Sequence, residues 1–236
     1  MRRALLGLVC VSTLACTNGP GGDEAADEIG TDATTGTDET TDTGTDTGET
    51  TDTGELGCAE PTGEYGHGNL HPDCVGDNPQ VLLQTNVGDM TLQLDAVRAP
   101  ITVANFLGYV SSGFYDGTII HRVVDDFVIQ GGGFEPGLVE KTTVGTIPLE
   151  IDPELRHDDG AISMARRADP DSADSQWFIC DGPQHGLDGQ YAVFGVLIDG
   201  FEIRDAISMV PVHDVDPYTD VPVEDVVVER ACCVVP

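Results

Sequence analysis

Hydrophobic and polar residues alternate most clearly in the middle of the chain, between positions 113 and 134. Residues 118–124 (TIIHRVV) are rich in β-branched side chains, and residues 127–130 (FVIQ) resume the pattern after two aspartates that favour a turn. The pattern predicts a β-hairpin. One arginine and one glutamine stand among its apolar residues, and the segment closes on three glycines.

The pairing register of this hairpin decides what the two polar residues can do. With a three-residue loop at 125–127, Arg122 lies directly opposite Gln130, and both side chains project from the same face. The Gln130 carbonyl can then accept a hydrogen bond from the guanidinium, whose other N–H groups can reach an outside carbonyl, with Phe127 as an apolar surface beside them. We expect His121 to face the opposite way and to be structural. A surface arginine whose stem packs along the strand is the alternative interpretation.

A second informative run begins at Gly160 and reads GAISMARRADPDSADSQWFICDGPQHGLDGQYAVFGVLIDGFEIRDAI. Together with HRVVDDFVIQGG, the pieces GAISMAR, SADSQWFIC and LDGQYAVFG and a helix after Gly200 resemble the cyclophilin family of peptidyl-prolyl cis-trans isomerases. The order and spacing agree over roughly residues 80–230. The resemblance implies a mainly β fold: a closed eight-stranded antiparallel β-barrel capped by two helices, with the active groove on the outer face of the sheet.

The same resemblance implies roles for individual residues. Arg122 corresponds to the family's catalytic arginine, Gln130 to the glutamine that orients it, and Phe127 to an aromatic beside them. Positions that match the substrate-binding groove are Val128, Ala165, Arg166, Gln176, Phe178, Leu187 and Tyr191. Core packing is the ordinary role of such aromatics, and only their coincidence with the arginine and the glutamine favours a binding site. The implied reaction needs no metal and no cofactor.

The first residues, MRRALLGLVCVSTLAC, combine two arginines with an apolar stretch that is too short to span a bilayer. We interpret residues 1–15 as a signal peptide. Cys16 follows Leu14 and Ala15 as in the pattern at which bacterial lipoproteins are cleaved and lipidated, although Thr13 stands where that pattern prefers leucine. We therefore expect an exported protein of the cell envelope, lipid-anchored at Cys16, with simple secretion as the alternative.

Residues 16–57 contain the lipidation candidate and a tether composed almost wholly of Thr, Asp, Glu and Gly. Its composition and like charges predict an extended disordered spacer. Removing the twelve acidic residues of 17–57 and the two arginines near the start from the net charge of −32 leaves −22 for residues 58–236. A surface this acidic disfavours nucleic acid and direct membrane adsorption. We expect proline-containing peptides and unfolded client proteins as partners, and a monomer.

Seven cysteines fall into distinct groups. Cys180 lies in an apolar strand, where a buried free thiol is the ordinary role. The first and last strands of cyclophilins are neighbours, so the resemblance implies two disulfides between an N-terminal extension (58–79) and a short tail (231–236) that flank the isomerase domain (80–230). The cysteines concerned are Cys58, Cys74, Cys232 and Cys233, and their pairing stays open. A Cys58–Cys74 bridge with a vicinal Cys232–Cys233 bridge is the alternative.

Other motifs carry less chemistry. Cys58, His67, His71 and Cys74 lack the close paired spacing of zinc sites, and DPDSADS from Asp169 lacks the glycine of a calcium loop. Residues 214–220 are interpreted as an acidic, Pro-containing loop. The sequence therefore predicts a prolyl isomerase that assists the folding of exported proteins. A non-catalytic proline-peptide binding module and a tethered surface interaction protein of the same fold are the rival interpretations.

Overall fold

The computed structural model describes residues 57–63 and 72–235. The signal-like segment, Cys16, the tether and both histidines near Cys74 lie outside the described residues. Within them, no helix combines enough length and apolar character to span a bilayer.

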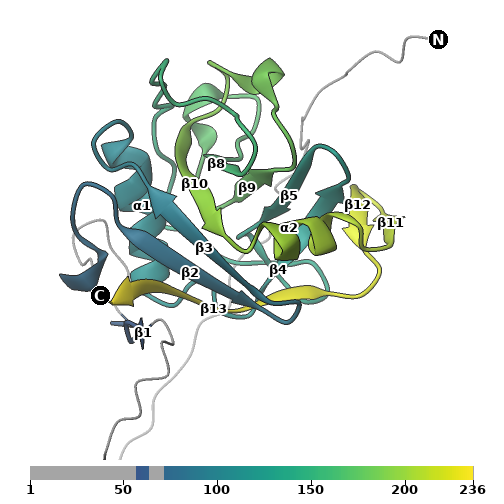
Figure 1. Cartoon of the computed structure of the whole chain (residues 1–236). Coiled ribbons are helices and arrows are strands. Elements are labelled where there is room, and N and C mark those ends of the chain that lie inside the picture. Colours follow the sequence, from purple (N-terminus) through teal and green to yellow (C-terminus); the bar gives the residue numbers. More distant parts are fainter. Residues whose placement is uncertain (1–56, 64–71, 236) are drawn as a thin grey trace, which may run out of the picture. The chain divides into compact units, whose positions relative to one another are not determined.

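Eight strands close into an antiparallel barrel in the order β13, β2, β3, β10, β8, β9, β5, β4, and β4 pairs in turn with β13 (Figure 1). The closing pairs join Val226 to Ile120 and Val228 to Thr118. The predicted eight-stranded barrel is confirmed. Its strands are β2 (Gln80–Thr85), β3 (Asp89–Leu94), β4 (Thr118–Val124), β5 (Val128–Gly131), β8 (Ala161–Met164), β9 (Trp177–Cys180), β10 (Val193–Asp199) and β13 (Val226–Val235).

Two α-helices accompany the barrel. Helix α1 (Pro100–Ser111) begins on a proline, whose missing N–H costs nothing in the first turn, and buries residues spaced by three and four: Val103, Phe106, Leu107 and Val110. Helix α2 (Phe201–Ser208) follows Gly200, which has a φ of 85°. A Cβ at this glycine would collide with the backbone of β3, so the sharp entry into α2 requires glycine.

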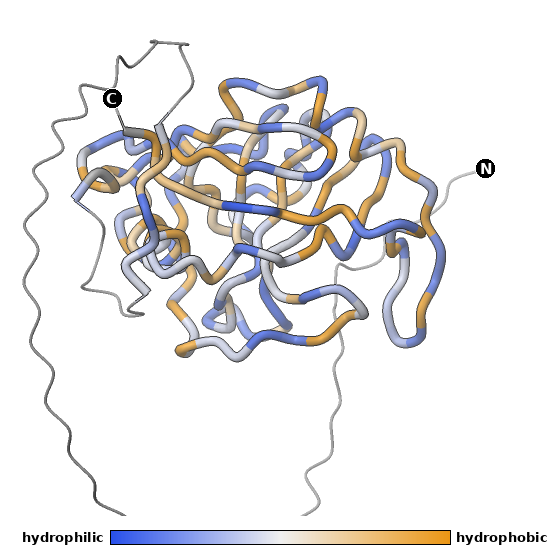
Figure 2. Tube along the Cα trace, turned by 90° about the horizontal axis from the view of Figure 1, so that it is seen from below, coloured by the Kyte–Doolittle hydropathy of each residue, from blue (hydrophilic) through white to orange (hydrophobic). Residues whose placement is uncertain are grey.

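The barrel interior is filled by side chains that alternate along the strands and by the apolar face of α1. Phe106 lies at the centre, with its ring centroid 5.2 Å from that of Tyr115 and 5.1 Å from that of Phe194. Figure 2 shows hydrophobic and hydrophilic stretches interspersed along the trace of the chain. Phe106, Tyr115 and Phe194 are fully buried there, so the interior is a packed core.

Two disulfides join the segment before the barrel to its last strand. The short strand β1 (Gly57–Cys58) pairs with the end of β13, and Cys58 is bonded to Cys232. Cys74, in a short 3₁₀ helix (Pro72–Cys74), is bonded to Cys233. Strand β13 continues through both C-terminal cysteines. Each bridge closes a long loop, of the kind for which a stabilisation of about 2–4 kcal/mol is typical.

Two small antiparallel pairs lie outside the barrel: β6 (Phe134–Glu135) with β7 (Val139–Glu140), and β11 (Val212–Val215) with β12 (Tyr218–Pro222). The second pair contradicts the acidic loop predicted at 214–220. Most residues of β11 are exposed, so this hairpin lacks the alternation of apolar and polar residues by which strands are predicted.

Candidate active site

The hairpin β4–β5 has the predicted register. Val124 pairs with Val128, and Arg122 lies directly opposite Gln130. The loop residue Asp126 has a φ of 56°, a left-handed conformation that aspartate tolerates better than most residues. The turn closes when the Phe127 N–H donates to the Val124 carbonyl at 3.1 Å. A local turn therefore sets the arginine and the glutamine side by side.

A β-bulge immediately before Arg122 changes the face of its neighbour. The register shifts between Ile120 and Arg122, and Ile120 and Val123 both belong to the barrel core. His121 and Arg122 consequently share the outer face, and the prediction that His121 faces away from the arginine is wrong. Strict alternation fails here because the bulge inserts one extra residue into the strand.

His121 is buried beside the arginine. Its ring packs edge-on against Phe134, with 4.7 Å between centroids. Burial, and then the positive charge of Arg122, lower the pKa of His121 to about 4, although an interaction with Gln176 opposes the shift. The imidazole is therefore neutral at physiological pH.

Gln130 and Gln176 are joined by a hydrogen bond. The Gln130 side-chain amide donates to the Gln176 carbonyl oxygen at 3.1 Å, which links β5 to the segment before β9. The glycines at the end of β5 make this possible: a Cβ on Gly133 would lie 2.6 Å from the Gln176 side chain, and one on Gly132 would lie 2.7 Å from the indole of Trp177. The triple glycine is thus explained by close packing.

Five of the predicted groove residues, together with Phe127, gather in a second apolar cluster that is separate from the barrel interior. Phe178 on β9 is the cross-strand partner of Gln130 on β5. The Phe178 ring contacts the Tyr191 ring edge-on, with 5.7 Å between centroids. Phe178 and Val128 are fully buried, Ala165 and Tyr191 are nearly so, and Phe127 and Leu187 are half-buried against them. We call this set the outer-face cluster.

Sequence reasoning missed several members of the outer-face cluster. Ala161, Val193 and Cys180 belong to it, and Leu155 packs against it. Val193 and Cys180 each lie two positions after a predicted member, so the two-residue period of a strand could have identified them. The prediction that Cys180 is a buried free thiol is confirmed. Burial raises the pKa of its thiol to about 12, which makes it unreactive.

A buried histidine lies behind Phe178 and was also missed. The ring of His157 stacks on Phe178 at 5.9 Å and 10°. Its Nδ1 is 2.9 Å from Asp188 Oδ1, and its Nε2 is 3.2 Å from the Ser163 hydroxyl. Because Asp188 follows Leu187, this network connects the segment that carries Leu187 to the buried ring of Phe178. No local sequence pattern predicts this network, because His157, Ser163 and Asp188 come from three separate segments.

Charges border and support the cluster. Burial lowers the pKa of His157, against the opposing effect of Asp188. Burial by itself would raise the pKa of Asp188. Hydrogen bonds from His157 and Arg156 outweigh this effect and hold the pKa of Asp188 well below its usual range. At the edges, the Arg122 guanidinium lies 6.0 Å from the centre of the Phe127 ring, and that of Arg166 lies 4.9 Å from the centre of the Tyr191 ring. Arg166 also donates to the Gln190 carbonyl at 2.9 Å.

An apolar surface with a guanidinium at its edge agrees with the comparison to known protein families. The family model described as cyclophilin type peptidyl-prolyl cis-trans isomerase/CLD matches residues 80–232, which is more than half of the chain. The chain belongs to the cyclophilin family. Peptidyl-prolyl cis-trans isomerisation is the activity of this family, so the chain is an enzyme of that type.

Bacterial cyclophilins are among its relatives. The chain is 46% identical over 156 residues to peptidyl-prolyl cis-trans isomerase A of Dickeya dadantii, which covers 64% of this chain and 82% of the relative. It is 40% identical over 157 residues to peptidyl-prolyl cis-trans isomerase B of Escherichia coli, covering 63% of this chain and 96% of the relative.

Solved cyclophilin structures have the same fold. A cyclophilin type peptidyl-prolyl cis-trans isomerase from Cryptosporidium parvum superposes with a TM-score of 0.61 at 31% identity, over 67% of this chain and 99% of the other. The same enzyme, crystallised in the presence of the dipeptide Ala-Pro, gives a TM-score of 0.60 over 66% of this chain and 99% of the other.

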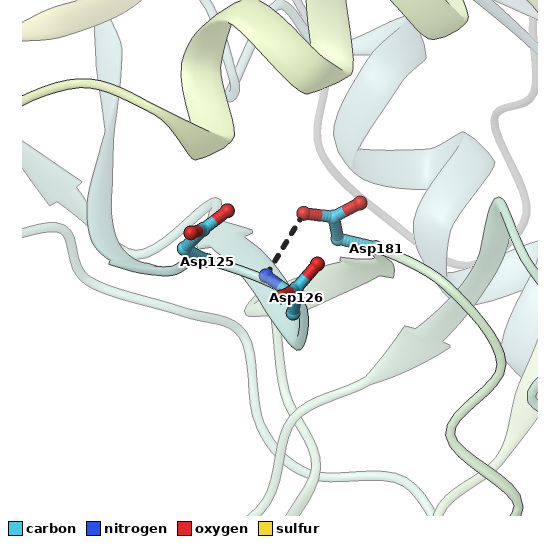
Figure 3. Close-up of side chains that lie close together, drawn as sticks. All are labelled: Asp125, Asp126 and Asp181. Carbon is cyan, nitrogen blue, oxygen red and sulfur yellow. Dashed lines mark hydrogen bonds between the residues drawn. The ribbon is translucent and has the colours of Figure 1, made fainter.

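Three carboxylates of this cyclophilin gather at the tip of β4–β5. Figure 3 shows Asp125, Asp126 and Asp181, whose nearest oxygens lie within 4.8 Å of one another. Within the described part of the chain, they are the side chains grouped closely enough to share a metal ion. Asp181 already accepts hydrogen bonds from the Asp126 N–H at 3.2 Å and from the Ser208 hydroxyl. These bonds account for its position without an ion.

Proposed function

We propose that Arg122 is the catalytic residue of this isomerase and that the outer-face cluster receives the proline ring of the substrate. The observation that carries the proposal is the common face: Arg122 and Gln130 stand opposite each other, beside half-buried Phe127 and Leu187. A charged donor next to an accessible apolar surface suits a substrate that presents a polar amide next to a five-membered aliphatic ring.

The reaction needs one well-placed donor and no covalent intermediate. Rotation of an X–Pro bond passes through a twisted amide that has lost its resonance, over a barrier of roughly 20 kcal/mol. A guanidinium that donates to the proline nitrogen, or holds the neighbouring carbonyl, interacts more strongly with the twisted state than with either planar isomer. Each tenfold acceleration requires only about 1.4 kcal/mol of such preferential stabilisation. Neither a metal nor a cofactor has a step to perform.

The supporting residues orient the donor and the peptide. Gln130 is hydrogen-bonded to Gln176 and stands across from the arginine, and we assign it the role of limiting the rotamers of Arg122. Ala165 and Arg166 form the side of the groove along which we place the extended peptide. The Arg166 guanidinium lies over the ring of Tyr191, and in this proposal that ring borders the bound proline.

We further propose that the enzyme works outside the cytoplasm, on the folding of exported proteins. Two disulfides support this placement, because such bonds persist in oxidising compartments and are rare in the cytosol. In this proposal the protein is anchored by a lipid on Cys16 and carried on the acidic tether. Mass spectrometry of the mature N-terminus tests it: a lipidated Cys16 supports the anchor, and an unmodified residue elsewhere excludes it.

The catalytic proposal is tested by measuring isomerisation of an Ala-Pro peptide by the wild-type protein and by Arg122→Ala. We expect the variant to lose most of the activity while its circular dichroism and melting temperature are retained. Arg98→Ala is the matched control, because this arginine pairs with Asp95 and Glu154 on the surface and is not a member of the outer-face cluster. A peptide that binds without being isomerised by wild-type protein would instead favour a proline-peptide binding module.

A further inference from the structure

The hairpin β11–β12 lies against the outer side of the active-site strand, more than eighty residues further along the chain. Figure 1 shows it beside β4 and β5, and β12 packs on β4. The Tyr218 ring meets Phe134 edge-on at 5.3 Å, and Phe134 in turn contacts His121 at 4.7 Å. Contacts among these three rings therefore place the hairpin beside His121, the residue that precedes Arg122.

One carboxylate of this hairpin reaches the arginine itself. Asp220 Oδ2 lies 3.7 Å from the Nε of Arg122. The same oxygen accepts a hydrogen bond from the Thr219 hydroxyl at 3.1 Å, and the Asp220 N–H donates to Asp214 Oδ1 at 3.3 Å. Hydrogen bonds within its own hairpin thus position the Asp220 carboxylate independently of the guanidinium.

We propose that Asp220 is a positioning residue for Arg122. A guanidinium is planar, and its Nε lies on one edge of the plane. A negative charge at that edge favours the orientation in which Nε faces the hairpin and the opposite edge faces the peptide groove. Asp220 then acts on the isomerisation through Arg122 and touches no substrate. The inference rests on the catalytic role proposed for Arg122.

The backbone offers a competing explanation for an aspartate at this position. Asp220 has a φ of 58°, in the left-handed region where aspartate and asparagine are both enriched. A purely conformational role would be served equally well by asparagine, which has the same shape and no charge. Asp220→Asn therefore separates the two explanations.

The experiment compares isomerisation kinetics of wild type, Asp220→Asn, Arg122→Ala and the double variant on the same Ala-Pro peptide, at ionic strengths of about 0.01 M and about 1 M. At low ionic strength we expect Asp220→Asn to lower kcat/KM by about two- to fivefold, mainly through kcat, in keeping with a partly exposed ion pair. At high ionic strength the wild-type value should fall toward that of the variant. In the Arg122→Ala background, Asp220→Asn should have no further effect.

Asp216→Asn is the matched control, because Asp216 is an exposed carboxylate in the turn of the same hairpin. Melting temperatures of all variants establish that each is folded. Unchanged kcat/KM for Asp220→Asn at low ionic strength overturns the inference, and so does a loss that persists in the Arg122→Ala background. If Arg122→Ala keeps full activity, the catalytic role of Arg122 fails as well. That outcome is distinct from an inactive Arg122→Ala combined with a fully active Asp220→Asn.

Discussion

The barrel interior and the outer-face cluster are built from the same kinds of side chain, yet only one of them is a candidate site. In the interior, Phe106 and Phe194 are fully buried and surrounded by other apolar groups. In the outer-face cluster, Phe178 is equally buried, but Phe127 and Leu187 remain half-exposed, and guanidinium groups stand at the edges. Burial by itself does not distinguish a core from a pocket. The distinction comes from the accessible apolar atoms and the donors placed beside them.

The largest effect should follow a truncation in the interior. We expect Phe106→Ala to lower the free energy of unfolding by about 3–5 kcal/mol, because it removes a ring from the centre of a close-packed core. Chemical denaturation measures the loss. Activity per folded molecule should be unchanged, and a large fall in kcat of the folded variant would erase the functional difference between the two clusters.

Acidification should destabilise the protein through His121, which lies on the outer face. Its pKa of about 4 in the folded state is below the value of about 6.5 expected when unfolded, so the unfolded state takes up the proton first as the pH falls. Stability is fully present above about pH 6.5 and is lost toward pH 4, by about 2 kcal/mol between pH 7 and pH 4.5.

Urea denaturation of the wild type and of His121→Gln at these two pH values checks the prediction. The variant should be less stable at pH 7 but should lose less stability on acidification. The lowered pKa of His157 acts in the same direction in both proteins and cancels in the comparison. Equal losses in the two proteins would exclude His121 as the source.

Truncation of the outer-face cluster should separate activity from stability. Phe127→Ala removes a half-buried ring, so we expect it to cost about 1 kcal/mol of folding free energy, less than Phe106→Ala. Its kcat/KM should fall about tenfold, because in the proposed site the proline ring loses an apolar contact beside Arg122. Peptide kinetics and a thermal melt on the same sample measure both quantities. An equal loss of stability in the two Phe→Ala variants would contradict the proposed difference.

The smallest effect is expected at the far edge of the cluster. Arg166→Gln removes a guanidinium that stacks on Tyr191 and donates to the Gln190 carbonyl. We expect KM to rise about threefold with kcat retained, in line with about 0.5–1 kcal/mol for an exposed cation–π contact. Arg166→Lys keeps the charge but loses the planar fork, and should lie between wild type and Arg166→Gln. A change in kcat alone would argue for a catalytic role of Arg166 instead.

Local patterns predicted the part of the site that local structure builds. The register that sets Arg122 opposite Gln130 follows from one turn and two short strands, so it could be predicted from a dozen residues. The side of the sheet to which His121 points could not be predicted in this way, because the β-bulge depends on how β4 pairs with its neighbouring strands. The strands β11 and β12 were missed because β11 is largely exposed and its residues show no alternation of apolar and polar side chains, and because Asp214, Asp216 and Pro217 favour a loop. The His157–Asp188 network joins two separate loops, so no local sequence pattern predicts it.

The sequence by itself determined the family resemblance, the barrel, the hairpin that carries Arg122 and Gln130, and the set of cysteines available for bridges, because these depend on contiguous motifs and on residue types. Tertiary structure decided which cysteines pair, which aromatics form a half-exposed surface, and that Asp220 reaches Arg122. These are contacts between residues tens to more than a hundred positions apart. Their partners are selected by the closure of the barrel, which no local stretch of sequence encodes.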